Sequence, residues 1–496
     1  MATRHRCVRY GVERSRVREW LNYIGGRWTA AAAGRTTTLH DPGSTSEVVA
    51  TAASSSAEDV VQAVDAARAA QAAWAATPPS AREAMLRRFA DLVEADVENL
   101  ARTVTLEQGK PLAESRGEIA KAVAETRFMA GEAQRLHGVT AGGERPGTDA
   151  FSIRVPLGSV AAINPWNFPV STPLRKAIPA LVTGNTVILK PSELTPGPCA
   201  ELVRYFEEAG LPPGVVNLVI GDGPEVGRPL VDSDGVDGVS FTGSTAVGRE
   251  LYQRAARRLI PVQLEMGGKN PAIVSPSANL PAAVSEIAQA ALLTCGQRCT
   301  AISRVIAHED VVAEVRERLE VHLGGLAIGH GLDPSTQLGP LVSAEQLGII
   351  EGWVEQGIAD GARLVCGGHR PKRPDGGWYY TPTLLDGVTA DMAIAREEVF
   401  GPVIVLLSYR SFDEAMDVCN DVAYGLSACL FSRDLREIDV FSRTAQAGML
   451  HINRGTTPQS HLPFGGVKDS GVGAYSVGSS AVDFFTTVQT VYRAAD

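Results

Sequence analysis

One cysteine, Cys299, stands in the stretch GQRCTA (residues 296–301), where glycine and small residues flank it. Low side-chain bulk near a thiol lets a substrate reach it and leaves backbone N–H groups free to face an anion. Free cysteines are also common in inert cores, so this stretch alone favours neither interpretation. Arg298 would help to hold Cys299 as the reactive thiolate if its side chain faced the sulfur.

Two further segments offer groups that a reactive thiol needs. Asn167 follows a predicted strand within PWNFP, and its neutral amide could donate to a developing oxyanion. The alternative is an Asn that only satisfies loop backbone. Glu265 ends a predicted strand beside Gly267 and Gly268, where its carboxylate could hold a water as general base. The alternative for Glu265 is an ordinary salt bridge.

Three segments are suited to a nucleotide. Lys190 and Glu193 follow a strand and could grip a ribose diol, and the Glu193 carboxylate would repel a 2′-phosphate, which favours NAD over NADP. Phe241–Gly248 runs from a strand through a glycine and hydroxyls into a helix, an anion site for a pyrophosphate. Glu398, beside an aromatic residue, could hold a second ribose. Each pattern also fits ordinary turns, and the GxGxxG fingerprint is absent.

Seven motifs occur in one order: PWNFP, KPSE, FTGST, ExGGK, GQRC, EEVFGP and PFGG. In this order they resemble the NAD(P)-dependent aldehyde dehydrogenase superfamily, and the likeness runs from about residue 21 to the C-terminus. The resemblance implies Cys299 as nucleophile, Glu265 as general base, and Asn167 with the Cys299 backbone N–H as oxyanion hole. It also implies a cofactor site made of Ile163, Trp166, Lys190, Glu193, Gly223, Gly227, Ser244, Val247, Glu398 and Phe400.

The resemblance implies that Cys299 attacks a small aldehyde, hydride passes to NAD or possible NADP, and water activated by Glu265 releases a free acid. Four residues stand where this family often contacts substrate: Arg175, Arg298, Arg454 and Phe464. The planar fork of arginine suits carboxylate and phosphate. We therefore expect an aldehyde with a distal anionic group, similar to succinate semialdehyde or α-ketoglutarate semialdehyde. The arginines could instead make structural salt bridges.

Other functions stay open on the sequence. A broad-specificity dehydrogenase of neutral or aromatic aldehydes fits if the arginines are structural. A CoA-acylating relative generally lacks the base that Glu265 provides. A non-catalytic structural member of the fold would need none of Cys299, Glu265 and Asn167, and a plain Rossmann alcohol or hydroxy-acid dehydrogenase would need a His or Tyr proton relay instead.

Two positions near the nucleophile are unusual. Thr294 stands where members of the resembling family often carry Asn, and we expect the change to be tolerated. Cys295 lies four residues before Cys299, so on a helix the two would share a face. A reversible disulfide between them is one option, and a bystander thiol is the simpler one.

Apolar strands alternate with helices from about residue 159, which is typical of a parallel sheet covered on both faces. The predicted strands are Val160–Asn164, Thr186–Leu189, Val215–Ile220, Val236–Phe241 and Val262–Glu265. The predicted helices are Leu174–Val182, Pro198–Ala209, Glu225–Val231 and Ala246–Arg257. This pattern predicts a doubly wound, Rossmann-like half, with a second α/β region from Gly267 to about residue 460.

The ends of the chain carry shorter signals. A hairpin is predicted at Leu21–Trp28, and helices begin after Ser56 and at a capping box formed by Ser80 and Glu83. A glycine and proline near residue 110 end another helix. Residues 484–492 alternate apolar and polar side chains, which predicts a terminal strand that a neighbouring subunit would cover.

The fold class is therefore α/β, and the resemblance implies the aldehyde dehydrogenase fold. Residues 21–140 and 159–266 would form the NAD-binding domain, and residues 267–465 the catalytic domain. Residues 141–158 and 475–496 would form a β oligomerisation flap in a homodimer or homotetramer. Residues 1–20, which are basic, would be a disordered leader rather than a membrane or nucleic-acid arm.

Bulk properties exclude several classes of protein. A chain of 496 residues is too long for one core. Its net charge of −10 and pI of about 5.5 do not suggest nucleic-acid binding, and no apolar run has the length of a membrane span. Seven irregularly spaced cysteines and nine histidines without zinc spacing favour a reducing, cytoplasmic setting and no metal.

Overall fold

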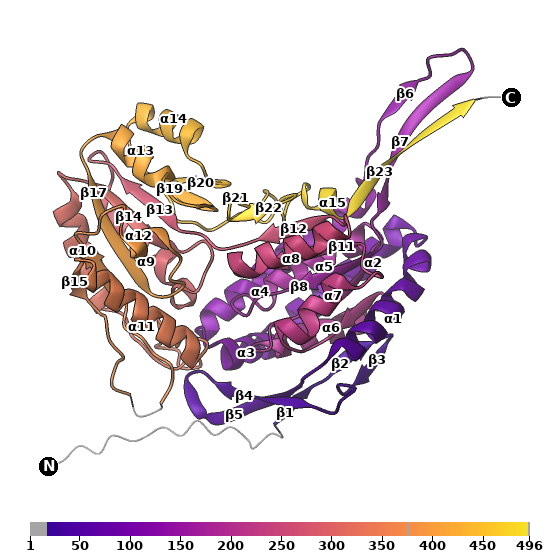
Figure 1. Cartoon of the computed structure of the whole chain (residues 1–496), viewed down its shortest axis with the longest axis horizontal. Helices are drawn as coiled ribbons and strands as arrows, with labels where there is room; N and C mark the ends of the chain where they lie inside the picture. The colour runs from indigo at the N-terminus through magenta and orange to yellow at the C-terminus, as the bar shows by residue number, and fades with distance from the viewer. Residues whose placement is uncertain (1–16, 374–375, 495–496) are drawn as a thin grey trace.

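Each of the two lobes is built on one large twisted sheet, and a slender arm of strands projects from the lobe formed by the first half of the chain (Figure 1). The computed structural model describes residues 17–373 and 376–494. Separate hydrophobic cores lie in the two lobes. Two lobes with their own cores agree with the expectation for a chain of this length.

The first sheet has the strand order β22-β12-β11-β8-β9-β10-β2-β3. Its middle strands pair in parallel and are β8 (Ser159–Ile163), β9 (Thr186–Lys190), β10 (Val216–Leu218), β11 (Gly238–Thr242) and β12 (Val262–Glu265). From β8 the chain adds β9 and β10 on one side, then β11 and β12 on the other. The predicted doubly wound sheet is confirmed, and its order reverses between β8 and β11, where such sheets bind ligands.

Crossover helices connect these strands, and a hairpin closes one edge of the sheet. The helices are α5 (Ser171–Val182), α6 (Pro196–Ala209), a π-helical turn η2 (Gly223–Gly227) leading into α7 (Arg228–Asp232), and α8 (Thr245–Arg257). The predicted hairpin is present as β2 (Asn22–Ile24) and β3 (Arg27–Thr29). The opposite edge pairs with β22 (Gly471–Val472), which brings the C-terminal part of the chain to β12.

Four helices precede the arm: α1 (Ala57–Ala75), α2 (Pro79–Ala95), α3 (Val97–Gln108) and α4 (Leu112–Ala130), followed by the turn η1 (Gly131–Gln134). Ser56 caps α1 as predicted, and Gly109 ends α3 in the left-handed conformation with φ 97°. The predicted capping box of Ser80 and Glu83 is wrong. Helix α2 begins at Pro79, so Ser80 lies inside the first turn, because the fixed φ of a proline favours the first helical position.

A smaller sheet of β1 (Arg18–Trp20), β5 (Ser44–Ala53) and β4 (Thr36–Asp41) lies beside these helices. The prediction of a disordered leader through residue 20 is therefore wrong at its end. Trp20 is buried, and its indole Nε1–H donates to Glu107 at 2.7 Å, which gives the strand a fixed place. Residues 1–16 of the predicted leader lie outside the described residues.

The second lobe has the strand order β15-β16-β17-β14-β13-β19-β20, parallel except between β15 and β16. Its strands are β13 (Asn270–Val274), β14 (Ile302–His308), β15 (Arg363–Cys366), β16 (Thr383–Asp386), β17 (Val403–Tyr409), β19 (Ser427–Phe431) and β20 (Met449–Ile452). Its helices are α9 (Leu280–Leu292), α10 (Val312–Gly324), α11 (Ala344–Ala359), α12 (Ala393–Arg396), α13 (Phe412–Asn420) and α14 (Leu435–Thr444). A ribbon of β18 (Tyr424–Gly425) and β21 (Val467–Lys468) leads back toward the first lobe.

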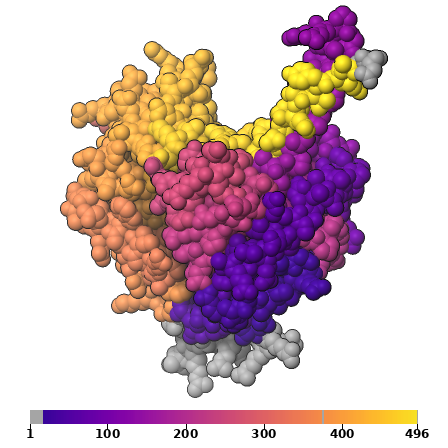
Figure 2. Space-filling model, turned by 45° about the vertical axis from the view of Figure 1, so that its right-hand side comes forward, coloured from indigo at the N-terminus to yellow at the C-terminus, as the bar shows by residue number. Residues whose placement is uncertain are grey.

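The arm consists of β6 (Thr140–Gly142), β7 (Thr148–Pro156) and β23 (Thr486–Ala494), and it stands away from the body in Figure 2. The predicted terminal strand begins two residues later than expected, because Phe484 belongs to α15 (Ala481–Phe484) and Phe485 is buried in the first lobe. Strand β23 pairs with β7 of the same chain, so one of its edges is already covered. Within the described part of the chain, its other edge has no strand partner.

The described residues contain no helix that is both long and apolar enough to span a membrane. Over the same residues, no group of three or more His, Cys, Asp and Glu side chains is arranged to hold a metal ion.

Candidate active site

A cavity of about 650 Å³ is lined by residues of both lobes. It brings together many side chains that the sequence singled out: Trp166, Asn167, Arg175, Ser244, Glu265, Arg298, Cys299, Glu398, Phe400 and Phe464. Side chains that the sequence did not single out also line it: Glu114, Glu118, Lys121 and Lys176. Residues as far apart in the chain as Trp166 and Phe464 thus meet at the carboxyl edge of the first sheet, next to the end of α9.

Cys299 reaches the cavity through a sharp reversal after α9. The turn η3 (Leu293–Gly296) has positive φ at three consecutive residues, 56° at Thr294, 55° at Cys295 and 69° at Gly296. A Cβ on Gly296 would lie 2.1 Å from the Gly401 carbonyl oxygen, so only glycine fits there. The helix ends before Cys295, which is buried in the core, whereas Cys299 faces the cavity. The prediction of a shared helix face for the two thiols is wrong.

Thr294 adopts a left-handed conformation that is unfavourable for a β-branched residue. Its backbone N–H donates to Glu114 Oε2 at 2.6 Å, and its hydroxyl lies 3.3 Å from the same oxygen. Asn adopts this conformation more readily than Thr, which explains the Asn of the resembling family in physical terms. In this chain the carboxylate of Glu114, on α4, stabilises the turn through its hydrogen bonds to Thr294.

Asn167 and Cys299 line the same cavity. The amide Nδ2 of Asn167 donates to the Gln297 carbonyl oxygen at 2.9 Å, which leaves its second N–H available. Gln297 is itself held on both sides, by the Thr294 carbonyl and by the Val342 backbone N–H. Across residues 17–373 and 376–494, the Cys299 backbone N–H has no hydrogen-bond partner. One amide N–H of Asn167 and the Cys299 backbone N–H therefore have no acceptor among the described residues.

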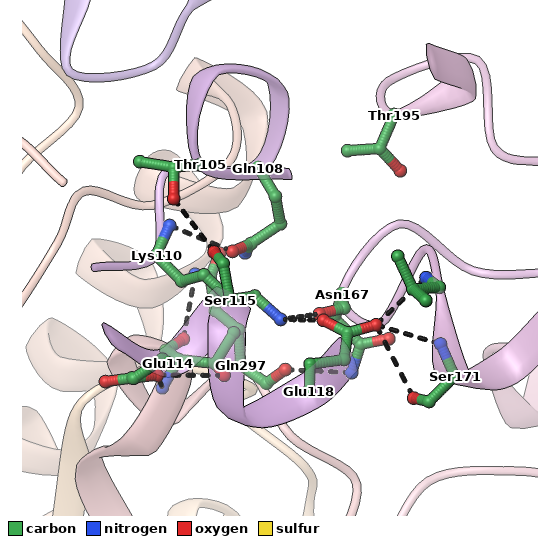
Figure 3. Close-up of polar contacts among 12 residues, drawn as sticks. Thr105, Gln108, Lys110, Glu114, Ser115, Glu118, Asn167, Ser171, Thr195 and Gln297 are labelled. Carbon is green, nitrogen blue, oxygen red and sulfur yellow. Dashed lines mark hydrogen bonds and ion pairs between the residues drawn. The ribbon is translucent and has the colours of Figure 1, made fainter. Parts of the chain in front are cut away.

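A buried ion pair fixes the loop that carries Asn167 (Figure 3). Lys110 Nζ lies 2.8 Å from Glu118 Oε2 and donates to the Asn167 backbone carbonyl at 2.7 Å. Glu118 Oε1 accepts from the backbone N–H groups of Val170 at 2.9 Å and Ser171 at 3.0 Å, at the start of α5. Sequence reasoning treated Lys110 only as part of a helix stop and missed this network.

We expect a Glu118→Gln variant to lower kcat by about 10- to 100-fold with little change in KM, because small shifts of a positioned donor cost this much. The variant should also melt at a lower temperature, since Lys110 is left without its buried counter-charge. Steady-state kinetics and thermal denaturation measure the two effects. A Lys110→Met/Glu118→Gln double variant, which leaves no unpaired charge, should recover stability but not kcat. Recovery of both would show that the pair acts only on stability.

Glu265 ends β12 with its side chain at the cavity wall. Its Oε1 accepts from the Ser476 hydroxyl at 3.3 Å, and its buried Oε2 has no partner among the described residues. Burial raises the pKa of Glu265 to about 7, and the positive charges of Lys176 and Arg175 oppose the rise. Lys176, which the sequence gave no reason to select, donates to the Thr242 hydroxyl at 2.5 Å. A carboxylate of this kind can accept a proton near neutral pH.

The thiol of Cys299 is not held as a thiolate by its surroundings. Burial raises its pKa to about 12, the charge of Glu398 adds to the rise, and Arg298 lowers the pKa without compensating. Arg298 thus acts on the pKa of Cys299 in the expected direction, but burial has the larger effect. A neutral thiol has to lose its proton to a base when its sulfur bonds to a carbonyl carbon, and the carboxylate of Glu265 lines the same cavity.

The carboxyl edge of the first sheet offers the groups that a dinucleotide needs. Lys190 is the last residue of β9, and its Nζ lies 3.6 Å from Glu193 Oε2 in the loop that follows. A Cβ on Gly227 would lie 4.0 Å from the Lys190 side chain. Ser244 is the N-cap of α8, and its hydroxyl accepts from the Val247 N–H, so the helix N-terminus faces this edge. A diol and a pyrophosphate fit such a pair and such a helix end.

A second group of residues fits the other end of the nucleotide. Glu398 Oε1 accepts from the Gly268 N–H at 3.0 Å, and a Cβ on Gly267 would lie 2.0 Å from the same carboxylate. Phe400 packs edge-on against Trp166 with 5.3 Å between ring centroids. Some of the predicted cofactor residues lie outside the main cavity, along the adjoining edge of the sheet: Ile163, Lys190, Glu193, Gly223, Gly227 and Val247.

The three arginines predicted to contact substrate differ in how many of their N–H groups already donate to other protein groups. Arg175 Nε and Nη2 both donate to Glu125 at 2.8 Å, and its guanidinium lies over the Phe464 ring at 4.8 Å. Arg298 Nη2 donates to the Thr300 hydroxyl, while its buried Nη1 has no partner among the described residues. Arg454 donates to a loop carbonyl and does not line the cavity. The salt-bridge alternative thus holds for one edge of Arg175.

Comparisons with known proteins agree with this geometry. A model described as the aldehyde dehydrogenase family matches residues 28–491. The alpha-ketoglutaric semialdehyde dehydrogenase of Bacillus subtilis (strain 168) is 40% identical over 480 residues, which cover 95% of this chain and 98% of that protein. The alpha-ketoglutarate semialdehyde dehydrogenase of Haloferax volcanii is 40% identical over 479 residues, with the same coverage. The crystal structure of an NAD-dependent aldehyde dehydrogenase from Sinorhizobium meliloti has a TM-score of 0.94 at 37% identity, covering 96% of this chain and 95% of that one.

Proposed function

Because the chain belongs to the aldehyde dehydrogenase family, we propose that it oxidises a semialdehyde with a distal carboxylate to the free dicarboxylic acid, with NAD as hydride acceptor. The observation that carries the proposal is the meeting of Cys299, Asn167 and Glu265 in one cavity beside the carboxyl edge of a doubly wound sheet. The carboxylate of Glu193 would repel a 2′-phosphate, which favours NAD, and NADP is the alternative.

The residues of the chain divide the reaction into two covalent stages. Glu265 accepts the thiol proton as the Cys299 sulfur bonds to the aldehyde carbon, and the Asn167 amide and Cys299 N–H donate to the resulting oxyanion. The nicotinamide cofactor, when bound, supplies the acceptor for the hydride that leaves this carbon. The C–H bond electrons depart as the carbonyl reforms, which leaves a thioester on Cys299. Glu265 first releases the thiol proton to solvent, which restores its carboxylate. It then accepts a proton from the water that attacks the thioester, and the Cys299 thiolate that leaves takes this proton back as the free acid is released.

The alternatives fit these residues less well. A structural member of the fold would have no use for an oxyanion donor and a base converging on one thiol. A CoA-acylating enzyme would not need the base at residue 265, whose position at the cavity supports hydrolysis to a free acid. A broad-specificity dehydrogenase of neutral aldehydes would have no use for Arg298, whose Nη1 lacks a partner among the described side chains.

We expect the purified protein to oxidise α-ketoglutarate, glutarate and succinate semialdehydes with kcat/KM at least about tenfold above hexanal and benzaldehyde, because a charge-assisted contact to a carboxylate is worth that much or more. NADH formation across this panel measures the preference, and repeating it with NADP tests the role of Glu193. A higher kcat/KM for hexanal or benzaldehyde would contradict the proposed substrate class, and acceleration by free CoA would favour the acylating alternative.

The arm and the cysteines support two further parts of the proposal. Strand β23 leaves one edge unpaired among the described residues, with exposed Val488 and Tyr492, and an exposed edge of this kind is normally covered. We therefore propose a homodimer or homotetramer in which residues 141–158 and the C-terminal strand act as the oligomerisation flap. The irregular spacing of seven cysteines supports a reducing compartment such as the cytoplasm.

A further inference from the structure

Helix α4 carries one line of ionisable side chains, most of which face the cavity. Glu114, Glu118, Lys121 and Glu125 are spaced by four, three and four residues, which places them on one helical face. Each of the three glutamates is bound by protein groups, namely Thr294, the start of α5 with Lys110, and Arg175. Lys121 is the cation in this line, and it also lines the cavity.

Lys121 keeps donor capacity that its neighbours have lost. Its ammonium donates to the Pro458 carbonyl at 3.1 Å and lies 3.9 Å from Glu125, beyond a normal hydrogen bond. An ammonium has three N–H groups, so at least one remains for a ligand. Arg175, by contrast, gives one edge of its guanidinium to Glu125 and one face to Phe464.

We propose that Lys121 receives the distal carboxylate of the substrate, together with Arg298, and thereby sets the preference of the enzyme for anionic aldehydes. This inference rests on the proposed function and names the residue that produces its specificity. Arg175 then has a different role: paired with Glu125, it shapes the cavity wall and holds Phe464 beside Cys299. Lys121 is a specificity residue that touches the substrate away from the reacting carbon.

The excess of positive charge around Lys121 favours the binding of an anion. Burial lowers the pKa of Lys121 to about 7, and the positive charges of Arg175, Arg298 and Arg454 lower it further, while Glu125 opposes them. A carboxylate at this position would relieve the repulsion and raise the pKa. The free enzyme therefore binds anionic substrates best below this pKa and loses the contribution of Lys121 as pH rises.

The test compares glutarate semialdehyde with its uncharged methyl ester as substrates of the intact enzyme. A Lys121→Met variant should lose about 10- to 100-fold in kcat/KM for the acid, mainly through KM, and change by less than about threefold for the ester. Lys121→Arg should restore most of the loss. Arg116→Gln is the matched control, because it removes one positive charge from the exposed side of the same helix, where Arg116 pairs with Glu98.

The ratio of the two kcat/KM values also tests the assignment across pH, because any proton required by the chemistry is common to both substrates. This acid-to-ester ratio should fall as pH rises through about 7 in the wild type and should be flat in Lys121→Met. An equal loss for acid and ester would mean that Lys121 only supports the fold, and would overturn the inference. A wild-type preference for the acid that survives in Lys121→Met would overturn it while leaving the proposed function intact. A wild type without that preference would contradict both.

Discussion

A Cys299→Ala variant should lose aldehyde oxidation by about 10⁴-fold or more, because removal of a catalytic nucleophile has effects of this size. Alanine fits the same backbone, whose unusual φ angles lie at residues 294–296 and not at 299. Without the sulfur no tetrahedral adduct forms, so the aldehyde carbon has no route to donate hydride. NADH formation under saturating substrate measures the loss.

A matched variant separates this effect from damage to the fold. Cys295→Ala removes a neighbouring thiol that is buried in the core of the second lobe, so it should lower stability slightly and leave kcat within about threefold. Nucleotide binding by Cys299→Ala, measured by calorimetry, should equal that of the wild type. Full oxidation activity in Cys299→Ala would contradict covalent catalysis and favour a hydride transfer of the Rossmann alcohol dehydrogenase type.

The sequence alone predicts the parts of the fold in which the local pattern of a segment also determines its place in the sheet. Strands β8, β9, β11 and β12 are short apolar runs followed by helices, so their order and their parallel pairing follow from connection rules. The residues after each strand then have to meet at one edge. This is why the sequence alone predicts that Asn167 and Glu265 belong to one site, and both line the same cavity.

Helix α4 shows what the sequence could not supply. Its ionisable residues Glu114, Glu118 and Lys121 look like the solvated face of an ordinary helix, and helical periodicity does not say which neighbour covers that face. Only tertiary packing places these side chains against the turn η3, which precedes Cys299, and against the loop that carries Asn167. The prediction that Cys295 and Cys299 share a helix face failed for the same reason. Helix α9 ends at Leu292, earlier than the apolar composition of the segment suggests.

A Glu265→Gln variant should turn over about 10²- to 10⁴-fold more slowly, since a glutamine keeps the shape of the side chain but cannot accept a proton. The pH profile should change with it. Because burial raises the pKa of Glu265 to about 7, the basic form accumulates only as pH rises through that value, so wild-type kcat should increase across this range. The variant should lose this rising limb. Steady-state NADH formation from about pH 5.5 to 9 covers the window around the pKa.

Hydroxylamine separates the two steps at which Glu265 accepts a proton. As a strong neutral nucleophile it cleaves a thioester without a general base, so it should restore NADH release and give a hydroxamate if hydrolysis is the step that fails. If hydroxylamine does not restore turnover, the base is needed earlier, to remove the proton of the Cys299 thiol, whose pKa is raised to about 12. Iodoacetamide should then alkylate Cys299 more slowly in the variant than in the wild type. Ser476→Ala is the control that keeps the Glu265 carboxylate. The Ser476 hydroxyl lowers the pKa of Glu265, so its removal should raise this pKa and move the rising limb to higher pH without abolishing it. A Glu265→Gln enzyme with the wild-type rate and pH profile would assign both proton transfers to another group.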